Sequence, residues 1–167
     1  MKCCIRVLTF VFLVVAMSGC GTTAIKESHP LLANSSVGNI ATVYFIRPDP
    51  GFRGVMGNAF TISLGGQELL TIAKGEYTLV YLKYYSGDVT VESSTVVDRD
   101  GMNTQVTVKE LLPFNFDGSK TYYITFKEKQ RGMMQGTSYI PYSITEDVAR
   151  NLASNLNPIG QAVAAPL

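Results

Sequence analysis

The sequence predicts a mainly β protein, a single antiparallel β-sandwich of about seven short strands with one C-terminal amphipathic helix. Three observations predict this fold. Runs rich in β-branched and aromatic residues recur between residues 40 and 127 at intervals of about 8–12 residues, Gly and Asp turns separate these runs, and one apolar stripe of helical period follows them. The chain's 167 residues are enough for one domain of ordinary size.

Residues 1–19 have the layout of a signal peptide. Lys2 and Arg6 supply positive charge, and residues 7–17 form an apolar run broken only by Thr9. A run this short suits the core of a signal peptide, whereas a membrane-spanning helix needs about 20 apolar residues. We therefore expect residues 1–19 to be removed, which takes the formal charge from +1 to −1.

The end of this segment, Met17-Ser18-Gly19-Cys20, resembles the lipobox of bacterial lipoproteins. Small residues before the thiol let a peptidase reach the backbone, and the thiol is the nucleophile that accepts the lipid. The resemblance implies cleavage between Gly19 and Cys20 and lipid attachment at Cys20. An ordinary secretory signal and an uncleaved anchor are the alternatives.

The residue after the expected attachment site bears on the membrane. An Asp in this position favours retention in the inner membrane of enterobacteria, and Gly21 lacks that signal. The resemblance therefore implies the periplasmic face of the outer membrane, with the inner membrane and the cell surface as alternatives. We expect the lipid on Cys20 to attach the chain to this membrane.

Residues 20–39 are predicted to be a flexible tether, because they show no sustained periodicity and contain Gly, Ser, Thr, Asn and Pro. The domain is expected over residues 40–160. Runs 40–46 and 76–82 are apolar on both faces and should be interior, whereas Phe60, Ile62 and Leu64 alternate with polar residues before a Gly-Gly hairpin turn. The expected strands are 40–46, 59–64, 67–72, 76–82, 89–95, 105–111 and 121–127.

The end of the domain is predicted to be a helix over residues 144–156. Ser143 with Glu146 fits a capping box, and Thr145 is a competing N-cap. The apolar stripe that should pack on the sheets consists of Ile144, Val148, Leu152 and Leu156. Pro158 then ends the pattern, and residues 161–167 should form a frayed tail.

Several kinds of chemistry are disfavoured by the composition. The expected domain contains no His and no Cys, because His29 lies in the tether, so Ser-His-Asp and Cys-His catalysis and the usual zinc sites are excluded there. The near-neutral charge, with no excess of Lys and Arg, does not indicate nucleic-acid binding, and no motif indicates a cofactor. An alternative is a carboxylate-based hydrolase of envelope glycan, with the candidate residues Asp88, Glu92, Asp98 and Glu110.

Two long connections are candidates for binding a partner, since loops carry binding more often than strands do. These are residues 49–58 and 129–142. Each combines an Arg, Met and an aromatic residue, types that suit interfaces. The candidate contact residues are Phe52, Arg53 and Met56 in the first loop and Arg131, Met133, Met134, Tyr139 and Tyr142 in the second.

Three segments resemble the domain of unknown function 2846 family of bacterial lipoproteins. They are the run Ala41-Thr42-Val43-Tyr44-Phe45-Ile46-Arg47-Pro48, the hairpin of residues 62–70 and the turn Gly75-Glu76-Tyr77. The similarity covers residues 40–128, although residues 85–88 lack the Pro and His expected there. The resemblance implies a compact β-sandwich on a lipid anchor and supplies no catalytic residues. We therefore expect a non-catalytic envelope lipoprotein that binds a protein or a cell-wall partner.

Overall fold

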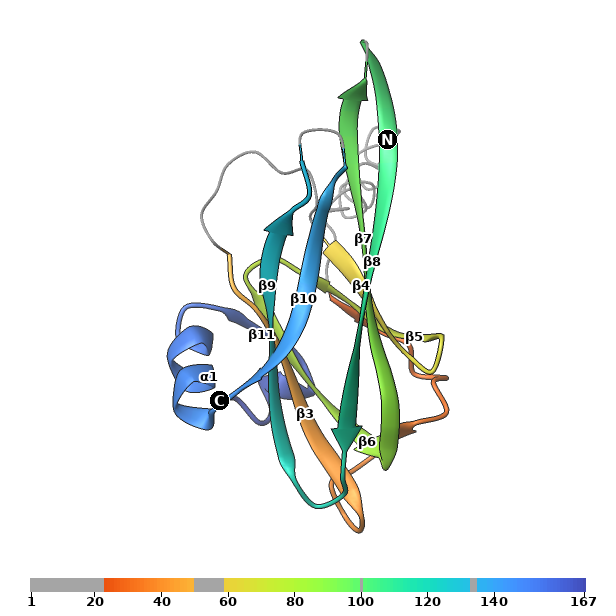
Figure 1. Ribbon diagram of the computed structural model, residues 1–167. Helices are drawn as coiled ribbons and strands as arrows, with labels where there is room; N and C mark the ends of the chain where they lie inside the picture. Colours follow the sequence, from red (N-terminus) through yellow and green to blue (C-terminus); the bar gives the residue numbers. More distant parts are fainter. Residues whose placement is uncertain (1–22, 50–58, 100, 133–134) are drawn as a thin grey trace, which may run out of the picture.

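The protein is mainly β, with two sheets packed face to face and one helix on the outer side of one sheet (Figure 1). A computed structural model describes residues 23–49, 59–99, 101–132 and 135–167. Within these residues eleven strands are present rather than about seven. Two short strands lie in the predicted tether, one follows the helix, and part of the expected connection over 129–142 is itself a strand.

The five-stranded sheet is largely a set of sequential hairpins. Its order is β1 (Ala24–Ile25), β5 (Gln67–Ala73), β4 (Ala59–Leu64), β7 (Tyr85–Arg99) and β8 (Met102–Phe116). The predicted alternation of Phe60, Ile62 and Leu64 is confirmed, since all three are buried. Gly65 and Gly66 form the turn between β4 and β5 with φ of 58° and 78°, a backbone conformation that glycine adopts without strain.

The six-stranded sheet is mixed, so the predicted antiparallel pairing holds for most strand pairs but not for all of them. Its order is β10 (Thr137–Ile144), β9 (Thr121–Gln130), β3 (Ile40–Arg47), β6 (Glu76–Lys83) and β11 (Asn157–Gly160), and β2 (Leu32–Ala33) also pairs with β6. The β3–β9 and β6–β11 pairs are parallel. Residues far apart in the chain are thereby brought together, which sequence spacing alone did not indicate.

Strands β3 and β6 are interior, as their double-sided apolar pattern predicted. Val43 and Phe45 of β3 face the five-stranded sheet and belong to the core between the sheets. Tyr44 and Ile46 face the other way and pack with Ala149 of the helix in a second apolar cluster. The six-stranded sheet is therefore covered on both sides, which is why its central strands need apolar residues at nearly every position.

The helix is shorter than predicted and packs through a different face. Helix α1 spans Glu146–Ala153 with Thr145 as its N-cap, and its buried residues are Ala149 and Ala153. Val148, predicted to be a core contact, is 47% exposed. Ile144 ends β10 instead of starting the helix. Because the predicted stripe begins at Ile144, it lies one residue away from the true contact face.

The predicted frayed tail is packed on the domain. Residues 157–160 form β11, and the 3₁₀ helix η1 (Gln161–Val163) follows with Ala162 fully buried. The Tyr44 hydroxyl donates a hydrogen bond to the carbonyl oxygen of Ala165 at 3.1 Å. The prediction for residues 161–167 is therefore wrong for the backbone that the structure describes.

The predicted tether is also docked from Thr23 onward. The Thr23 backbone N–H donates to Glu76 Oε2 at 3.0 Å, and β1 and β2 pair with the two sheets. His29 is only 6% exposed, and its Nδ1 accepts the backbone N–H of Leu31 at 3.2 Å. These contacts leave residues 20–22 as the part of the predicted tether that lies outside the described residues.

Strands β7 and β8 are each 15 residues long, roughly twice the predicted length. Ser86-Gly87 has the composition of a turn, but both residues lie inside β7. Gly87 is needed there because the Tyr85 ring folds over it, and a Cβ would lie 2.7 Å from the Tyr85 hydroxyl oxygen. That hydroxyl accepts the Gly65 N–H and donates to the Asp88 carbonyl, each at 2.8 Å.

Candidate functional site

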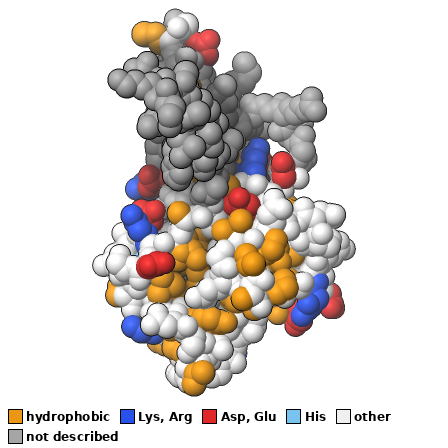
Figure 2. Space-filling view, turned by 180° about the vertical axis from the view of Figure 1, so that it is seen from behind, with side chains coloured by type: hydrophobic (Ala, Val, Ile, Leu, Met, Phe, Trp, Pro, Cys, Tyr) orange, Lys and Arg blue, Asp and Glu red, His pale blue; other side chains and the backbone are white. Residues whose placement is uncertain are grey.

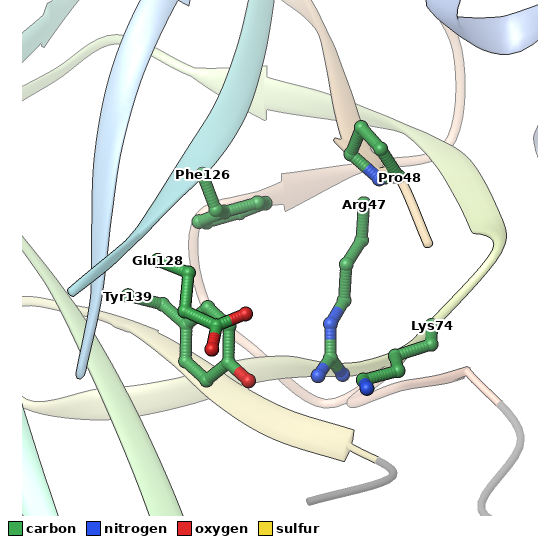
Figure 3. Close-up of a pocket in the computed structure, with 6 residues that line it drawn as sticks. All are labelled: Arg47, Pro48, Lys74, Phe126, Glu128 and Tyr139. Carbon is green, nitrogen blue, oxygen red and sulfur yellow. The ribbon is translucent and has the colours of Figure 1, made fainter. Parts of the chain in front are cut away.

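A small cavity lies between the end of strand β3, the β5–β6 turn, and strands β9 and β10. Its volume is about 130 Å³. Figure 3 shows charged and hydroxyl groups pointing into a common space from separate elements, with one aromatic ring as an apolar wall. The lining residues are Arg47, Pro48, Lys74, Phe126, Glu128 and Tyr139.

Arg47 is the buried positive charge of this cavity. It is the last residue of β3 and is only 2% exposed. Its guanidinium lies 4.2 Å from the centroid of the Phe60 ring and 5.1 Å from that of Tyr139, and Nη1 donates to the carbonyl oxygen of Ile72 at 2.7 Å. Burial lowers the pKa of Arg47, but a guanidinium stays protonated in proteins. The two rings therefore hold a permanent charge in a largely dry setting.

Tyr139 supplies a buried hydroxyl beside this charge. Its side chain is 7% exposed, and its hydroxyl makes no hydrogen bond of ordinary geometry with any residue that the structure describes. Burial raises the pKa of Tyr139, and the nearby positive charge of Arg47 opposes that rise. Buried polar groups are nearly always satisfied, and the Arg47 guanidinium and the open space of the cavity are the two sources of a partner for this hydroxyl.

The remaining lining groups carry opposite charges. Lys74 lies in the turn between β5 and β6, and Glu128 lies on β9 across the cavity. Neither forms an ion pair with another residue in the described part of the chain. Phe126 provides the apolar wall and packs edge-on against Phe60 with ring centroids 4.6 Å apart. The cavity thus presents both charge signs within a small volume.

Many of the predicted site residues fall outside the described residues. This holds for Gly19 and Cys20, for the first predicted loop with Phe52, Arg53 and Met56, and for Met133 and Met134 of the second. Lipid attachment, signal cleavage and the contact role of these residues stay predictions.

The described part of the second predicted loop is mostly strand, so the prediction of a long connection over 129–142 is wrong. Strands β9 and β10 pair across it as a hairpin. Tyr139 is a buried residue of β10, while Tyr142 is exposed on the same strand. Arg131 lies in the turn and forms an ion pair with Glu110. Of the predicted contact residues in the described part, only Tyr139 lines the cavity.

The sequence contains one signal that could have indicated this site. Arg47 follows a run that is apolar except for Thr42 and precedes Pro48, a position in which the end of a central strand carries a charge into the domain. Lys74, Phe126 and Glu128 carry no comparable signal, because strand and turn positions of these types are normally solvent-exposed or part of the core.

The candidate carboxylates are spread along β7 and over both faces of the sheet. Asp88, Glu92 and Asp98 lie on one face of β7, and a rise of about 3.3 Å per residue separates the first two by about 13 Å. Glu110 is paired in register with buried Val91 and faces the opposite side of the sheet. Glycoside hydrolases need carboxyl groups about 5–9.5 Å apart.

The carboxylates with shifted pKa values are shifted in the direction opposite to that of a general acid. Arg131 lowers the pKa of Glu110, and Lys120 lowers that of Asp117. A general acid that works near neutral pH needs a raised pKa. Glu92 pairs with Lys109 across β7 and β8 at 2.6 Å.

Metal-binding clusters and membrane-spanning helices are both absent from the described residues. In residues 23–49, 59–99, 101–132 and 135–167, no group of three His, Cys, Asp or Glu side chains is arranged to hold a metal ion. The same part of the chain has no helix of the length and apolarity that a membrane crossing requires.

The surface opposite the view of Figure 1 adds one observation. On the face in Figure 2, charged side chains lie mainly at the margins, and apolar side chains gather between them. The coloured part of this view shows no cluster of basic side chains. Comparison of the chain with protein-family models, with curated proteins and with solved structures finds no match.

Proposed function

We propose that this chain is a lipid-anchored, non-catalytic lipoprotein of the bacterial envelope, whose β-rich domain binds a protein or cell-wall partner in the periplasm. The observation that carries the proposal is Met17-Ser18-Gly19-Cys20, a lipobox-like sequence directly behind a short apolar run and a basic start. The resemblance of residues 40–128 to the domain of unknown function 2846 lipoproteins supports the same assignment. Gly21 favours the outer membrane over the inner one.

The docked N-terminal segment refines this proposal. Thr23 is bound to Glu76 through its backbone N–H and its hydroxyl, and it is three residues after Cys20. Each residue spans at most about 3.6 Å, so the lipidated residue would be attached within about 11 Å of Thr23 along the backbone. Lipid on Cys20 would therefore hold the domain directly against the bilayer instead of on a long flexible tether.

A binding role is supported over catalysis by the arrangement of the acidic residues. Glu92 and Glu110 are engaged with Lys109 and Arg131, and the candidate pairs are too far apart or on opposite faces for glycoside hydrolysis. The cavity of Arg47 and Tyr139 instead offers charge and hydrogen-bonding groups for a ligand.

The anchor is tested by replacing the cysteines one at a time in the full-length chain. Cys20→Ala should abolish incorporation of labelled palmitate and prevent signal cleavage. Cys3→Ala and Cys4→Ala are matched controls, because each makes the same Cys-to-Ala change within the segment expected to be cleaved. Labelling of Cys20→Ala at the level of the parent would show that the lipoprotein assignment is wrong.

The non-catalytic role is tested separately. Crosslinking in intact cells, followed by identification of the attached molecule, should recover a reproducible partner from the lipidated parent. The purified chain should not turn over envelope glycan. Turnover that Glu92→Gln or Glu110→Gln abolishes would establish the hydrolase alternative instead.

A further inference from the structure

The cavity lies close to Thr23, the first described residue after Cys20 in the sequence. The Ala73 N–H donates to Thr23 Oγ1 at 3.3 Å, and Thr23 in turn donates to Glu76. Lys74 follows Ala73 in the same turn and lines the cavity. A lipid on Cys20, as proposed above, would therefore place the cavity at the membrane-facing end of the domain.

The charges of the cavity match a ligand that carries both signs. Arg47 and Lys74 supply two positive groups, and the Tyr139 hydroxyl supplies a hydrogen-bond donor beside them. Glu128 supplies a negative group on the facing strand. A simple anion would use the first three groups and meet repulsion from Glu128, whereas a zwitterion could use all four.

We propose that this cavity binds the zwitterionic phosphoethanolamine headgroup of a membrane lipid. The phosphate oxygens would lie toward Arg47, Lys74 and the Tyr139 hydroxyl, and the ammonium would lie toward Glu128. The choice of a lipid as the source rests on the proposed anchoring, while the choice of a zwitterion rests on the cavity itself.

Size and chemistry favour a primary ammonium. The cavity of about 130 Å³ is close to the volume of about 150 Å³ that accommodates benzene in another protein, so only a small group can enter. A trimethylammonium group is bulkier and is recognised by aromatic cages. Here the Phe60 and Tyr139 faces are already occupied by the Arg47 guanidinium. A primary ammonium can also donate hydrogen bonds to the Glu128 carboxylate.

The test uses full-length Cys20→Ala chain and O-phosphoethanolamine as a soluble probe, with tyrosine ring resonances followed by NMR. The probe should shift the ring resonances of residue 139 in a saturable way, and in Tyr139→Phe the ring of the replacement Phe is followed instead. Tyr139→Phe, Lys74→Gln and Glu128→Gln should each weaken binding at least several-fold. The Tyr139→Phe change keeps the ring that packs on Phe60.

Matched controls separate the cavity from general charge effects. Tyr142→Phe removes an exposed hydroxyl from the same strand, and Lys120→Gln removes a surface ammonium that pairs with Asp117. Both should leave probe binding unchanged. The assignment of the cavity is wrong if Tyr142→Phe weakens binding as much as Tyr139→Phe, or if Lys120→Gln weakens it as much as Lys74→Gln. It is also wrong if no saturable shift occurs at millimolar probe.

Other ligands distinguish the chemistry. Inorganic phosphate and phosphocholine should bind more weakly than O-phosphoethanolamine, and glycine should do so as well. Equal binding of phosphate, unaffected by Glu128→Gln, would show a simple anion site and overturn the proposal. Tighter binding of glycine would show an amino-acid site and would also overturn it.

The membrane arm identifies the source of the ligand. Vesicles containing phosphatidylethanolamine should compete with the soluble probe, whereas vesicles of phosphatidylcholine with the same charge should not. Failure of competition overturns the lipid source. The two proposals can fail independently. Absence of palmitate labelling on the parent chain, with probe binding intact, would contradict the proposed function alone, and palmitate labelling of the parent without probe binding to the cavity would contradict the cavity assignment alone.

Discussion

Replacing two neighbouring residues of helix α1 tests which face of the helix holds it on the sheet. Ala149 is 0% exposed and belongs to the apolar cluster with Tyr44 and Tyr77, whereas Val148 is 47% exposed. The apolar stripe read from the sequence predicts that Val148→Asp is the damaging change. The structure predicts the reverse, that Ala149→Asp is damaging and Val148→Asp is nearly neutral.

The expected difference in unfolding free energy is large. A carboxylate at position 149 would be buried without a partner, at a cost of about 3–5 kcal/mol, and its extra atoms add about 1–3 kcal/mol of overpacking. At position 148 the carboxylate stays near solvent in the first helical turn. There the helix dipole stabilises the Asp carboxylate by about 0.3–1 kcal/mol, and this gain offsets the partial loss of Val148 packing.

Thermal and urea unfolding of the two variants measure this difference. A loss of about 4 kcal/mol corresponds to a fall in Tm of roughly 8–16 °C for a domain of this size, and Val148→Asp should change Tm by less than about 2 °C. Ala149→Ser provides a milder variant in case Ala149→Asp does not fold, with an expected loss of about 1–2 kcal/mol. Equal losses for Val148→Asp and Ala149→Asp would refute the packing of the helix through Ala149.

Three further changes test other parts of the fold. Gly118→Ala should destabilise by about 1–3 kcal/mol in urea unfolding, because its Cβ would lie 2.6 Å from the backbone carbon of Asn39 and no rotamer change can relieve that contact. Arg131 lowers the folded-state pKa of Glu110, so this pair stabilises above the ordinary Glu pKa and is lost as the pH falls through the lowered one. Glu110→Gln should therefore cost at most about 1 kcal/mol at neutral pH and nothing at pH about 2, in unfolding measured at both pH values. Thr23→Ala should cost about 1 kcal/mol and speed amide exchange in β1.

The central strands could be predicted because their environment imposes a strong pattern. Strand β3 is covered by the other sheet on one side and by the helix and C-terminal segment on the other, so both sets of alternating residues are apolar. Residues 40–46 therefore show in the sequence itself that both faces of this strand are buried. The β4–β5 hairpin was equally readable, because positive φ at Gly65 and Gly66 favours glycine at both turn positions.

The edges of the fold could not be predicted from local pattern. Strands β1 and β2 contain two residues each, which is too short for any periodicity, and their place is set by partners more than 40 residues away in the chain. The helix face was predicted wrongly for a related reason. Small residues make its contact with the sheet, since Ala149 and Ala153 allow a close approach, and large apolar residues nearby dominate the sequence pattern.

The cavity combines both difficulties. Its groups come from the end of β3, the β5–β6 turn, β9 and β10, and the parallel pairing of β3 with β9 brings two of these together without a recognisable spacing. The docking of Thr23 beside the β5–β6 turn places this cavity near the first described residue that follows Cys20 in the sequence. A flexible tether of the predicted length would have left the domain free to turn relative to an anchor on Cys20. The two-residue strand β1, the least conspicuous element in the sequence, is therefore what links the expected anchor to one particular site on the domain.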